Sequence, residues 1–235
     1  MPSQLMITRI KKRPTSACRV YLVRHGTTTI NMEDCYRGRR DVPLDVQGYQ
    51  DAVEAARRLA DIGLTAVYTG PLRRTIAMAE IIADLARLPD LRILQGLNNV
   101  DYGAWEGMTA EEAAIYDTNA FALYLTSPRQ AVCPQGERLL DAQERILAAL
   151  QFIGSRHPGE AVAAVTHAVM IRLVLMELTG ADGEDWRRTV NRGSVIELHI
   201  EDGTIRLAAL PDQNGHRARL GARMSLSSSN GKEAG

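Results

Sequence analysis

The sequence predicts an α/β fold of three layers, in which helices cover both faces of a mainly parallel central sheet. Short runs rich in apolar and β-branched residues alternate with longer stretches whose apolar residues recur at helical spacing. The short runs are almost continuously apolar, which is typical of parallel strands buried on both faces. We expect one domain over residues 17–212, because residues 1–16 and 213–235 have little to bury and are predicted to be flexible tails.

Six runs are predicted to be strands. Two of them, residues 195–200 and 205–210, flank a turn sequence at 201–204 and predict a hairpin at one edge of the sheet. The other four are expected to be parallel and covered on both faces, and they lie at residues 18–23, 64–69, 91–94 and 161–166.

Helices are predicted between these strands. Asp45 can cap a helix that Gly63 ends. Pro71 suits the first turn of a second helix, which continues towards Pro89. The same apolar spacing predicts two further helices, at residues 139–153 and 169–178.

Residues 107–135 fit this alternation poorly. The segment places Tyr116, Phe121 and Tyr124 among small residues. We expect a helical insertion that forms a lid over a pocket.

The charge balance excludes a general attraction to polyanions. Lys and Arg together number 28, as do Asp and Glu, so we expect no nucleic-acid partner. The chain has neither a run of 18 apolar residues nor a secretory signal, so we expect no membrane association and a cytoplasmic protein. Three widely spaced cysteines, Cys18, Cys35 and Cys133, predict free thiols rather than a disulfide framework or a zinc site.

Histidine and arginine follow three of the predicted parallel strands. Arg24 and His25 follow the first, Arg73 and Arg74 come shortly after the second, and His167 follows the fourth. Because ligands bind beyond the carboxyl ends of such strands, these side chains are expected to form one anion site. Guanidinium groups match phosphate oxygens, and a neutral imidazole can attack phosphorus to form a phosphohistidine. We expect no metal or cofactor, and a structural role for His167 stays open.

Six separated segments carry further information. They are RHGTTTIN at 24–31, GRRDVPLDVQG at 38–48, GPLRR at 70–74, GAWEG at 103–107, PQGE at 134–137 and VTHA at 165–168. In this order they resemble the signature motifs of the histidine phosphatase superfamily, in its phosphoglycerate-mutase-like branch, and residues 191–194 extend the likeness. The resemblance implies the phosphoglycerate-mutase-like form of the three-layer fold.

The resemblance also implies a role for each matching residue. His25 is expected to be the nucleophile, while Arg24, Arg74, Asn31 and His167 are expected to hold the phosphoryl oxygens. His25 must be neutral to attack, and its cationic neighbours lower its pKa in that direction. His167, if protonated, would add a third positive donor. The further expected substrate contacts are Thr28, Asn99 and Arg37, of which Arg37 could equally be a solvated surface residue.

One position departs from the family pattern. The segment before GAWEG normally reads LxE, and its glutamate is the acid that protonates the leaving oxygen, whereas this chain has Asn99 there. An amide has no proton to give at neutral pH, and the loss of general acid catalysis is worth roughly 10²- to 10⁴-fold in rate. Asp101 and Glu106 are candidate replacements, since residues 99 and 101 would share a face if the segment were a strand. A structural or solvated role for either acid stays open.

The sequence therefore favours a metal-independent phosphatase that hydrolyses small phosphomonoesters through a phosphohistidine at His25. The alternative is a weak or inactive family member that binds a phosphorylated ligand or partner. A phosphoglycerate mutase is less favoured, because the long basic insertion that such mutases carry after the tryptophan motif has no counterpart here. A homodimer stays open.

Overall fold

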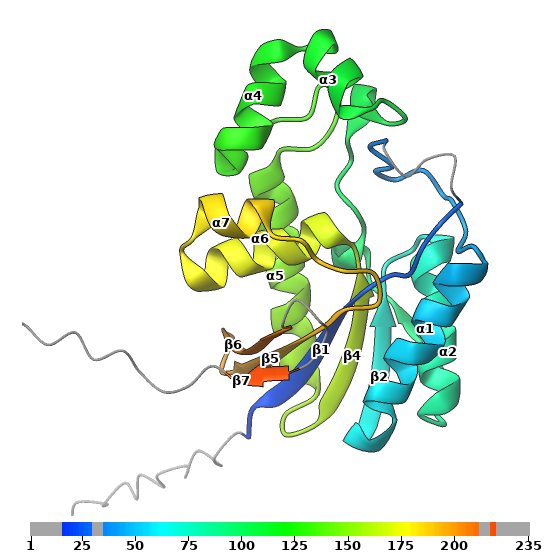
Figure 1. Cartoon of the computed structure of the whole chain (residues 1–235). Coiled ribbons are helices and arrows are strands. Elements are labelled where there is room, and N and C mark those ends of the chain that lie inside the picture. Colours follow the sequence, from blue (N-terminus) through cyan, green and yellow to red (C-terminus); the bar gives the residue numbers. More distant parts are fainter. Residues whose placement is uncertain (1–15, 30–34, 212–216, 220–235) are drawn as a thin grey trace, which may run out of the picture.

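One sheet runs through the computed structural model, which describes residues 16–29, 35–211 and 217–219. Within these residues it has seven strands in the order β3-β2-β4-β1-β5-β6-β7, with helices on both faces (Figure 1). The predicted fold class is confirmed. The strands are β1 (Cys18–Arg24), β2 (Leu64–Thr69), β3 (Arg92–Ile93), β4 (Ala161–Thr166), β5 (Val195–Glu201), β6 (Thr204–Pro211) and β7 (Arg217–Arg219).

The sheet has a parallel half and an antiparallel half. Strands β3, β2, β4 and β1 are parallel, and β5, β6 and β7 follow as an antiparallel edge. The predicted hairpin is β5–β6, whose turn has positive φ at Asp202 and Gly203. Residues 217–219 pair with β6, so this part of the predicted C-terminal tail is a strand. The rest of both predicted tails, apart from Ser16, lies outside the described residues.

The predicted strand at residues 91–94 differs from expectation. Strand β3 comprises two residues, Arg92 and Ile93, and both are exposed. It pairs only with the end of β2, at Tyr68 and Thr69, and it forms the edge of the sheet. An edge position leaves its side chains uncovered, so apolar content alone was a poor guide to burial here.

Helices cover each face of the sheet. Helices α1 and α2 lie on one face, and α5 and α6 lie on the other (Figure 1). Alternate residues of β1 therefore enter two cores: Tyr21 and Val23 face α1 and α2, while Val20 and Leu22 face α5 and α6. The helices are α1 (Val46–Leu59), α2 (Arg73–Leu85), α3 (Ala110–Tyr116), α4 (Thr118–Thr126), α5 (Leu139–Arg156), α6 (Ala168–Thr179) and α7 (Asp182–Arg187).

The predicted helix ends are mostly confirmed. Asp45 caps α1 by accepting a hydrogen bond from the Gly48 amide at 2.7 Å, and Gly63 follows the terminal turn with φ of 74°. Pro71 does not lie in the first turn of α2. Leu72 has an extended backbone, with φ of −83° and ψ of 142°, so the helix begins only at Arg73.

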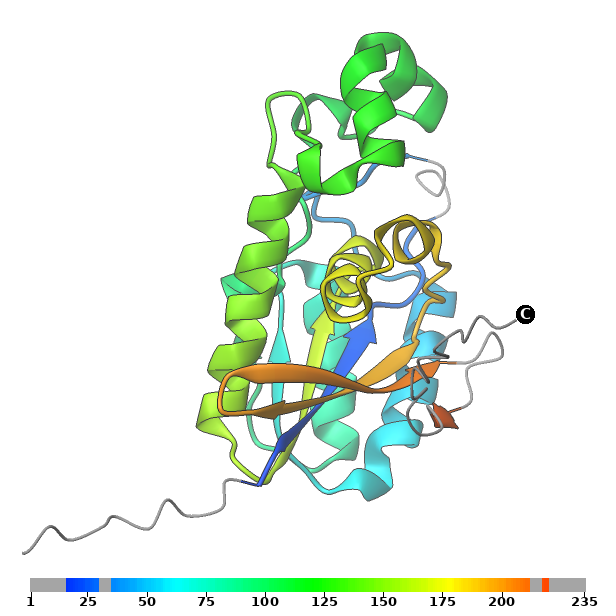
Figure 2. The same cartoon turned by 90° about the vertical axis from the view of Figure 1, so that its left-hand side faces the viewer.

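The predicted lid is helical. Helices α3 and α4 stand above the ends of β1 and β4, separated from the main helical layers (Figures 1 and 2). Phe121 and Tyr124 of α4 form an aromatic cluster with three rings from below the lid, Tyr36, Tyr102 and Trp105; the ring centroids of Tyr36 and Tyr102 lie 4.8 Å apart. This cluster joins the lid to the core on the α5 and α6 face.

Across the described ranges, no helix is both long enough and apolar enough to cross a membrane.

Candidate active site

The ends of β1 and β4 are tied together by their main chains. The His25 amide donates to the Thr166 carbonyl at 3.0 Å, and the Arg24 amide donates to the Ser194 carbonyl at 3.0 Å. His167 lies directly after β4, at the N-cap position of α6, and its side chain makes no capping hydrogen bond. The sheet therefore fixes the spacing of the two histidines, whose ring centroids lie 5.1 Å apart in an edge-to-face arrangement.

A single pocket collects most of the predicted site residues. Arg24, His25, Arg74 and His167 line it and are called the floor below. Three tyrosines and one further arginine also line it and are called the wall: Tyr36, Tyr102, Tyr124 and Arg172. The remaining predicted residues that line the pocket are Arg37 and Asn99.

His25 is held as a neutral imidazole. Its Nδ1 lies 2.7 Å from the Gly26 carbonyl oxygen, which can only accept, so Nδ1 carries the proton and Nε2 keeps its lone pair. Burial, followed by the charges of Arg74 and Arg24, holds the pKa of His25 well below its usual range. The imidazole is therefore uncharged at neutral pH.

His167 differs from the expectation of a positive donor. Burial, followed by the charge of Arg74, holds the pKa of His167 well below its usual range, so the ring is neutral at pH 7. Neither ring nitrogen has a hydrogen-bond partner among the described residues, although both are buried. His167 thus offers one N–H and one acceptor to a ligand. A bound dianion would raise its pKa, because an opposite charge favours the protonated form.

The two floor arginines are anchored by carbonyl groups. Arg74 is fully buried, and its Nη1 and Nη2 donate to Arg40 and Gly38 at 2.7 and 2.8 Å. Arg24 donates from Nη1 to Val190. In both side chains Nε is buried and has no partner among the described residues. Burial lowers the pKa of each guanidinium to about 10, so both remain charged at neutral pH.

Asn99 lies beside Arg74. Its Nδ2 donates to the Gly38 carbonyl at 2.9 Å, and Arg74 donates to the same oxygen. The Asn99 side-chain oxygen is buried and has no partner among the described residues. Its main-chain carbonyl accepts from Arg145 Nη2 at 2.8 Å, which holds the segment in place. The amide of Asn99 therefore lines the pocket at the position where the family motif has a carboxylic acid.

Neither candidate replacement acid lines this pocket. Asp101 accepts from Arg39 at 3.2 Å and from the Gly103 amide at 3.0 Å. Glu106 accepts from the Arg39 amide at 2.6 Å. The segment around Asn99 is not a strand, so the expected sharing of one face by residues 99 and 101 does not hold.

The other predicted contacts have separate outcomes. Thr28 is buried next to Leu44 and does not line the pocket. Asn31 lies outside the described residues. Arg37 does line the pocket, which favours a site role over a solvated surface position. Within the described ranges, no group of three or more His, Cys, Asp and Glu side chains is arranged to hold a metal ion.

Sequence reasoning missed part of the wall. Tyr36 comes from the loop after β1, Tyr102 from the segment before the tryptophan motif, and Arg172 from α6. Arg172 did carry a signal, because it is the only charged residue from Ala168 to Met176 in an otherwise apolar helix. Its Nε donates to the Arg188 carbonyl at 2.8 Å.

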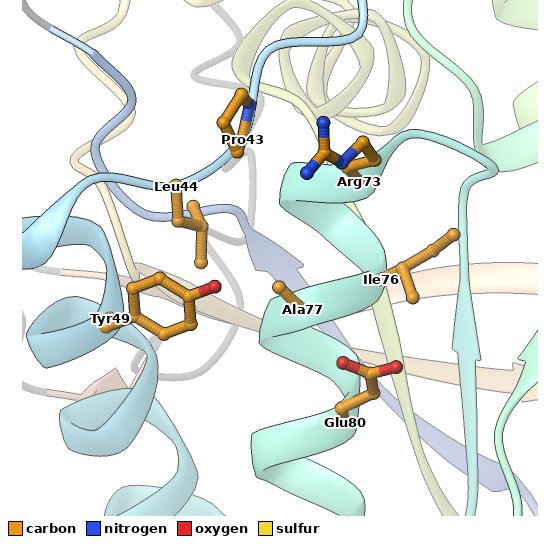
Figure 3. A pocket seen from close by; sticks show the side chains of 7 residues that line it. All are labelled: Pro43, Leu44, Tyr49, Arg73, Ile76, Ala77 and Glu80. Atoms are coloured by element: carbon orange, nitrogen blue, oxygen red, sulfur yellow. The ribbon is translucent and has the colours of Figure 1, made fainter.

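A second pocket lies between α1 and α2. Figure 3 shows Arg73, Ile76 and Glu80 on α2, with Tyr49 on the neighbouring helix α1. It contains no histidine, and it includes a carboxylate that would repel an anion. The first pocket is therefore the better candidate for an anion site.

Comparisons with known proteins find phosphatases among the relatives of this chain. A phosphatase from Bacillus subtilis, called uncharacterized phosphatase PhoE, is 31% identical over 166 residues, which is 70% of this chain and 79% of that protein. Phosphoserine phosphatase 1 of Hydrogenobacter thermophilus is 28% identical over 188 residues, or 78% of this chain and 87% of its own. The structure of Bacillus stearothermophilus YhfR is 34% identical with a TM-score of 0.74, over 82% of this chain and 96% of that one.

The relatives include phosphatases and probable phosphoglycerate mutases, so the chain is similar to enzymes of the phosphatase and mutase type. A family model described as "Histidine phosphatase superfamily (branch 1)" matches residues 20–213. The resemblance found in the sequence motifs is thereby confirmed, and the chain belongs to branch 1 of the histidine phosphatase superfamily.

Proposed function

We propose that the protein is a metal-independent phosphatase that hydrolyses small phosphomonoesters through a phosphohistidine at His25. The supporting observation is that a neutral His25, with Nε2 free, shares its pocket with buried donors that have no partner among the described residues. These donors are Arg24 Nε, Arg74 Nε and a nitrogen of His167. Buried polar atoms without partners are rare in folded proteins, so their convergence indicates a bound anion.

The floor accounts for both halves of the reaction. Nε2 of His25 attacks phosphorus, and Arg24 and Arg74 stabilise the charge that spreads over the equatorial oxygens. The Gly26 carbonyl stabilises the positive ring that forms, because it accepts from Nδ1 throughout. Water then attacks the phosphohistidine, and the neutral ring is regenerated.

The remaining question at this site is the leaving group. Asn99 cannot protonate an alkoxide, so esters of ordinary alcohols should react slowly. This feature also favours the second candidate function, a family member that binds a phosphorylated ligand or partner with little turnover.

Two measurements separate these functions. Purified wild type and His25→Ala are assayed with p-nitrophenyl phosphate, whose leaving group needs little protonation. We expect wild type to exceed the alanine variant by at least about 10³-fold, because removal of a covalent nucleophile leaves only binding effects. An acid-labile phosphoprotein should be trapped in wild type only. Equal rates in the two proteins, with phosphate still bound, would establish the binding function instead.

A further inference from the structure

We propose that the preferred substrates are phosphoanhydrides, whose terminal phosphoryl group moves to His25 and whose leaving group is a phosphate. The inference rests on the proposed phosphotransfer to His25 and narrows its substrate class. A diphosphate presents the same terminal phosphoryl dianion to the floor as a phosphomonoester does, but its leaving group is a much weaker base than an alkoxide.

The first supporting observation concerns proton donors. None of the described residues that line the pocket is Asp or Glu, and Asp101 and Glu106 are held by Arg39 outside it. The wall tyrosines are poor substitutes: Tyr102 and Tyr124 share one hydrogen bond at 3.0 Å, and burial raises the pKa of both hydroxyls well above the usual value. Burial also raises the pKa of Tyr36 to about 12. A substrate that needs no proton on its leaving oxygen suits this pocket best.

The second observation is an excess of positive charge. Four arginines line the pocket, and Arg37 and Arg172 come in addition to the two of the floor. None of the described lining residues is a carboxylate that could balance Arg172. One terminal phosphoryl dianion can neutralise the two guanidinium groups of the floor, so Arg172 remains to bind a second anionic group of the substrate. The phosphate that leaves from a diphosphate supplies that charge directly next to the bond that breaks.

The position of Arg172 fits this role. Its charge lies close enough to Tyr36, Tyr102 and Tyr124 to oppose the upward shift in their pKa values, so it belongs to the lid side of the pocket. The Arg188 carbonyl accepts from its Nε, and its terminal nitrogens have no ion-pair partner among the described residues. A planar guanidinium of this kind binds a phosphate through two parallel hydrogen bonds.

The step balances without an external acid. A bond forms between His25 Nε2 and the terminal phosphorus, while the bond from that phosphorus to the bridging oxygen breaks. The electron pair stays on the bridging oxygen, which becomes a terminal oxygen of the leaving phosphate. Water then attacks the phosphohistidine, the N–P bond returns its electron pair to Nε2, and the water proton passes to a phosphate product. Pyrophosphate and water thus give two phosphates.

Three substrates test the proposal on the full chain. Inorganic pyrophosphate has a weakly basic, anionic leaving group; p-nitrophenyl phosphate has a weakly basic leaving group with no second phosphate; glycerol 3-phosphate has a strongly basic alkoxide. We expect wild type to hydrolyse pyrophosphate with the highest kcat/KM and glycerol 3-phosphate at least about 10²-fold more slowly. Glycerol 3-phosphate hydrolysis as fast as that of the aryl ester would overturn the proposal, because an acid must then act in the site.

Variants assign the preference to named residues. Arg172→Gln should lower kcat/KM for pyrophosphate by about 10- to 100-fold and change the aryl ester by less than about threefold, since only pyrophosphate loses a charge-assisted contact. Arg187→Gln, on the exposed face of α7, removes the same charge and should change neither. Equal losses on both substrates would refute the role of Arg172.

Variants at Asn99 test the role of the leaving group. Asn99→Glu should raise the glycerol 3-phosphate rate by about 10²-fold or more, whereas Asn99→Gln, which has the same length but no acid, should not. An equal rise for pyrophosphate would contradict the proposal. Aryl hydrolysis that depends on His25, without pyrophosphate hydrolysis, refutes only this inference; the absence of turnover on all three substrates refutes the proposed function as well.

Discussion

The floor and the wall of the pocket are built in different ways. Three of the four floor residues lie within one residue of a strand end, and hydrogen bonds of the sheet fix two of their main chains. The wall residues come instead from a loop, an irregular segment, a lid helix and α6, and they meet only through side chains. The floor can therefore keep one chemistry while the wall changes the molecule to which that chemistry is applied.

The largest expected effect on activity comes from a substitution in the floor. Arg74→Gln should lower kcat/KM by about 10³-fold or more on every substrate, because an arginine that stabilises phosphoryl transfer contributes 10³–10⁵ in rate. The control is Arg73→Gln, which removes the same charge from the exposed neighbouring position and should leave the rates unchanged. A loss confined to pyrophosphate would mean that Arg74 binds the leaving phosphate and does not stabilise the transferred phosphoryl group. Thermal melting of both variants checks that they are folded.

A second substitution tests how much the aromatic cluster next to the wall contributes to the free energy of unfolding. Trp105 is fully buried and contacts Tyr36, Phe121 and Tyr124, so Trp105→Ala should lower the free energy of unfolding by about 3–5 kcal/mol. Urea unfolding of the whole chain should shift as one transition, because the aromatic cluster belongs to the main core. The matched control is Ile115→Ala, at a position that is 83% exposed. A separate early transition would mean that the lid unfolds alone.

Acid should lower the free energy of unfolding of the chain through the two histidines of the floor. His25 and His167 have folded pKa values below the unfolded value of 6.5, so the unfolded chain binds more protons as the pH falls through that value. Stability is then lost by up to about 1.4 kcal/mol per pH unit for each histidine. Urea unfolding between pH 7.5 and 5 should show a steeper loss in wild type than in His167→Gln. Parallel curves would mean that His167 is protonated in the folded protein.

The smallest expected effect concerns Asp101. Because it binds Arg39 and the Gly103 amide outside the pocket, Asp101→Asn should change the rates on glycerol 3-phosphate and on the aryl ester by less than about twofold. A tenfold loss restricted to glycerol 3-phosphate would identify Asp101 as the acid. It would also contradict the expectation that alkyl esters react slowly because Asn99 cannot donate a proton.

The floor was predictable from the sequence for a physical reason. Arg24, His25 and His167 directly end or follow strands, and the carboxyl ends of parallel strands meet at one edge of the sheet. Asn99 was found through the order of the motifs alone, since no strand carries it. Periodicity could not find Tyr36 or Tyr102, because irregular segments have no repeating direction for their side chains.

The prediction that Asp101 or Glu106 could replace the missing acid differs from the structure for a related reason. The hypothesis for Asp101 assumed an extended segment, whereas Gly103 has φ of 54° and starts a tight turn at Trp105. That turn directs Asp101 to the Gly103 amide and lets Glu106 bind the Arg39 amide. Sequence spacing predicts which residues are neighbours along a regular element, but a single left-handed residue changes where the next side chains go.

The hydrogen bond from the His25 amide to Thr166 has a consequence for dynamics. This amide is buried between the two central strands of the sheet, so its hydrogen should exchange with solvent only when the whole molecule opens. The proposed nucleophile, His25, is thereby coupled to the most slowly opening part of the chain. Molecules that have lost the alignment of His25 should then be molecules that have lost the fold, and heat inactivation should report global unfolding rather than local damage.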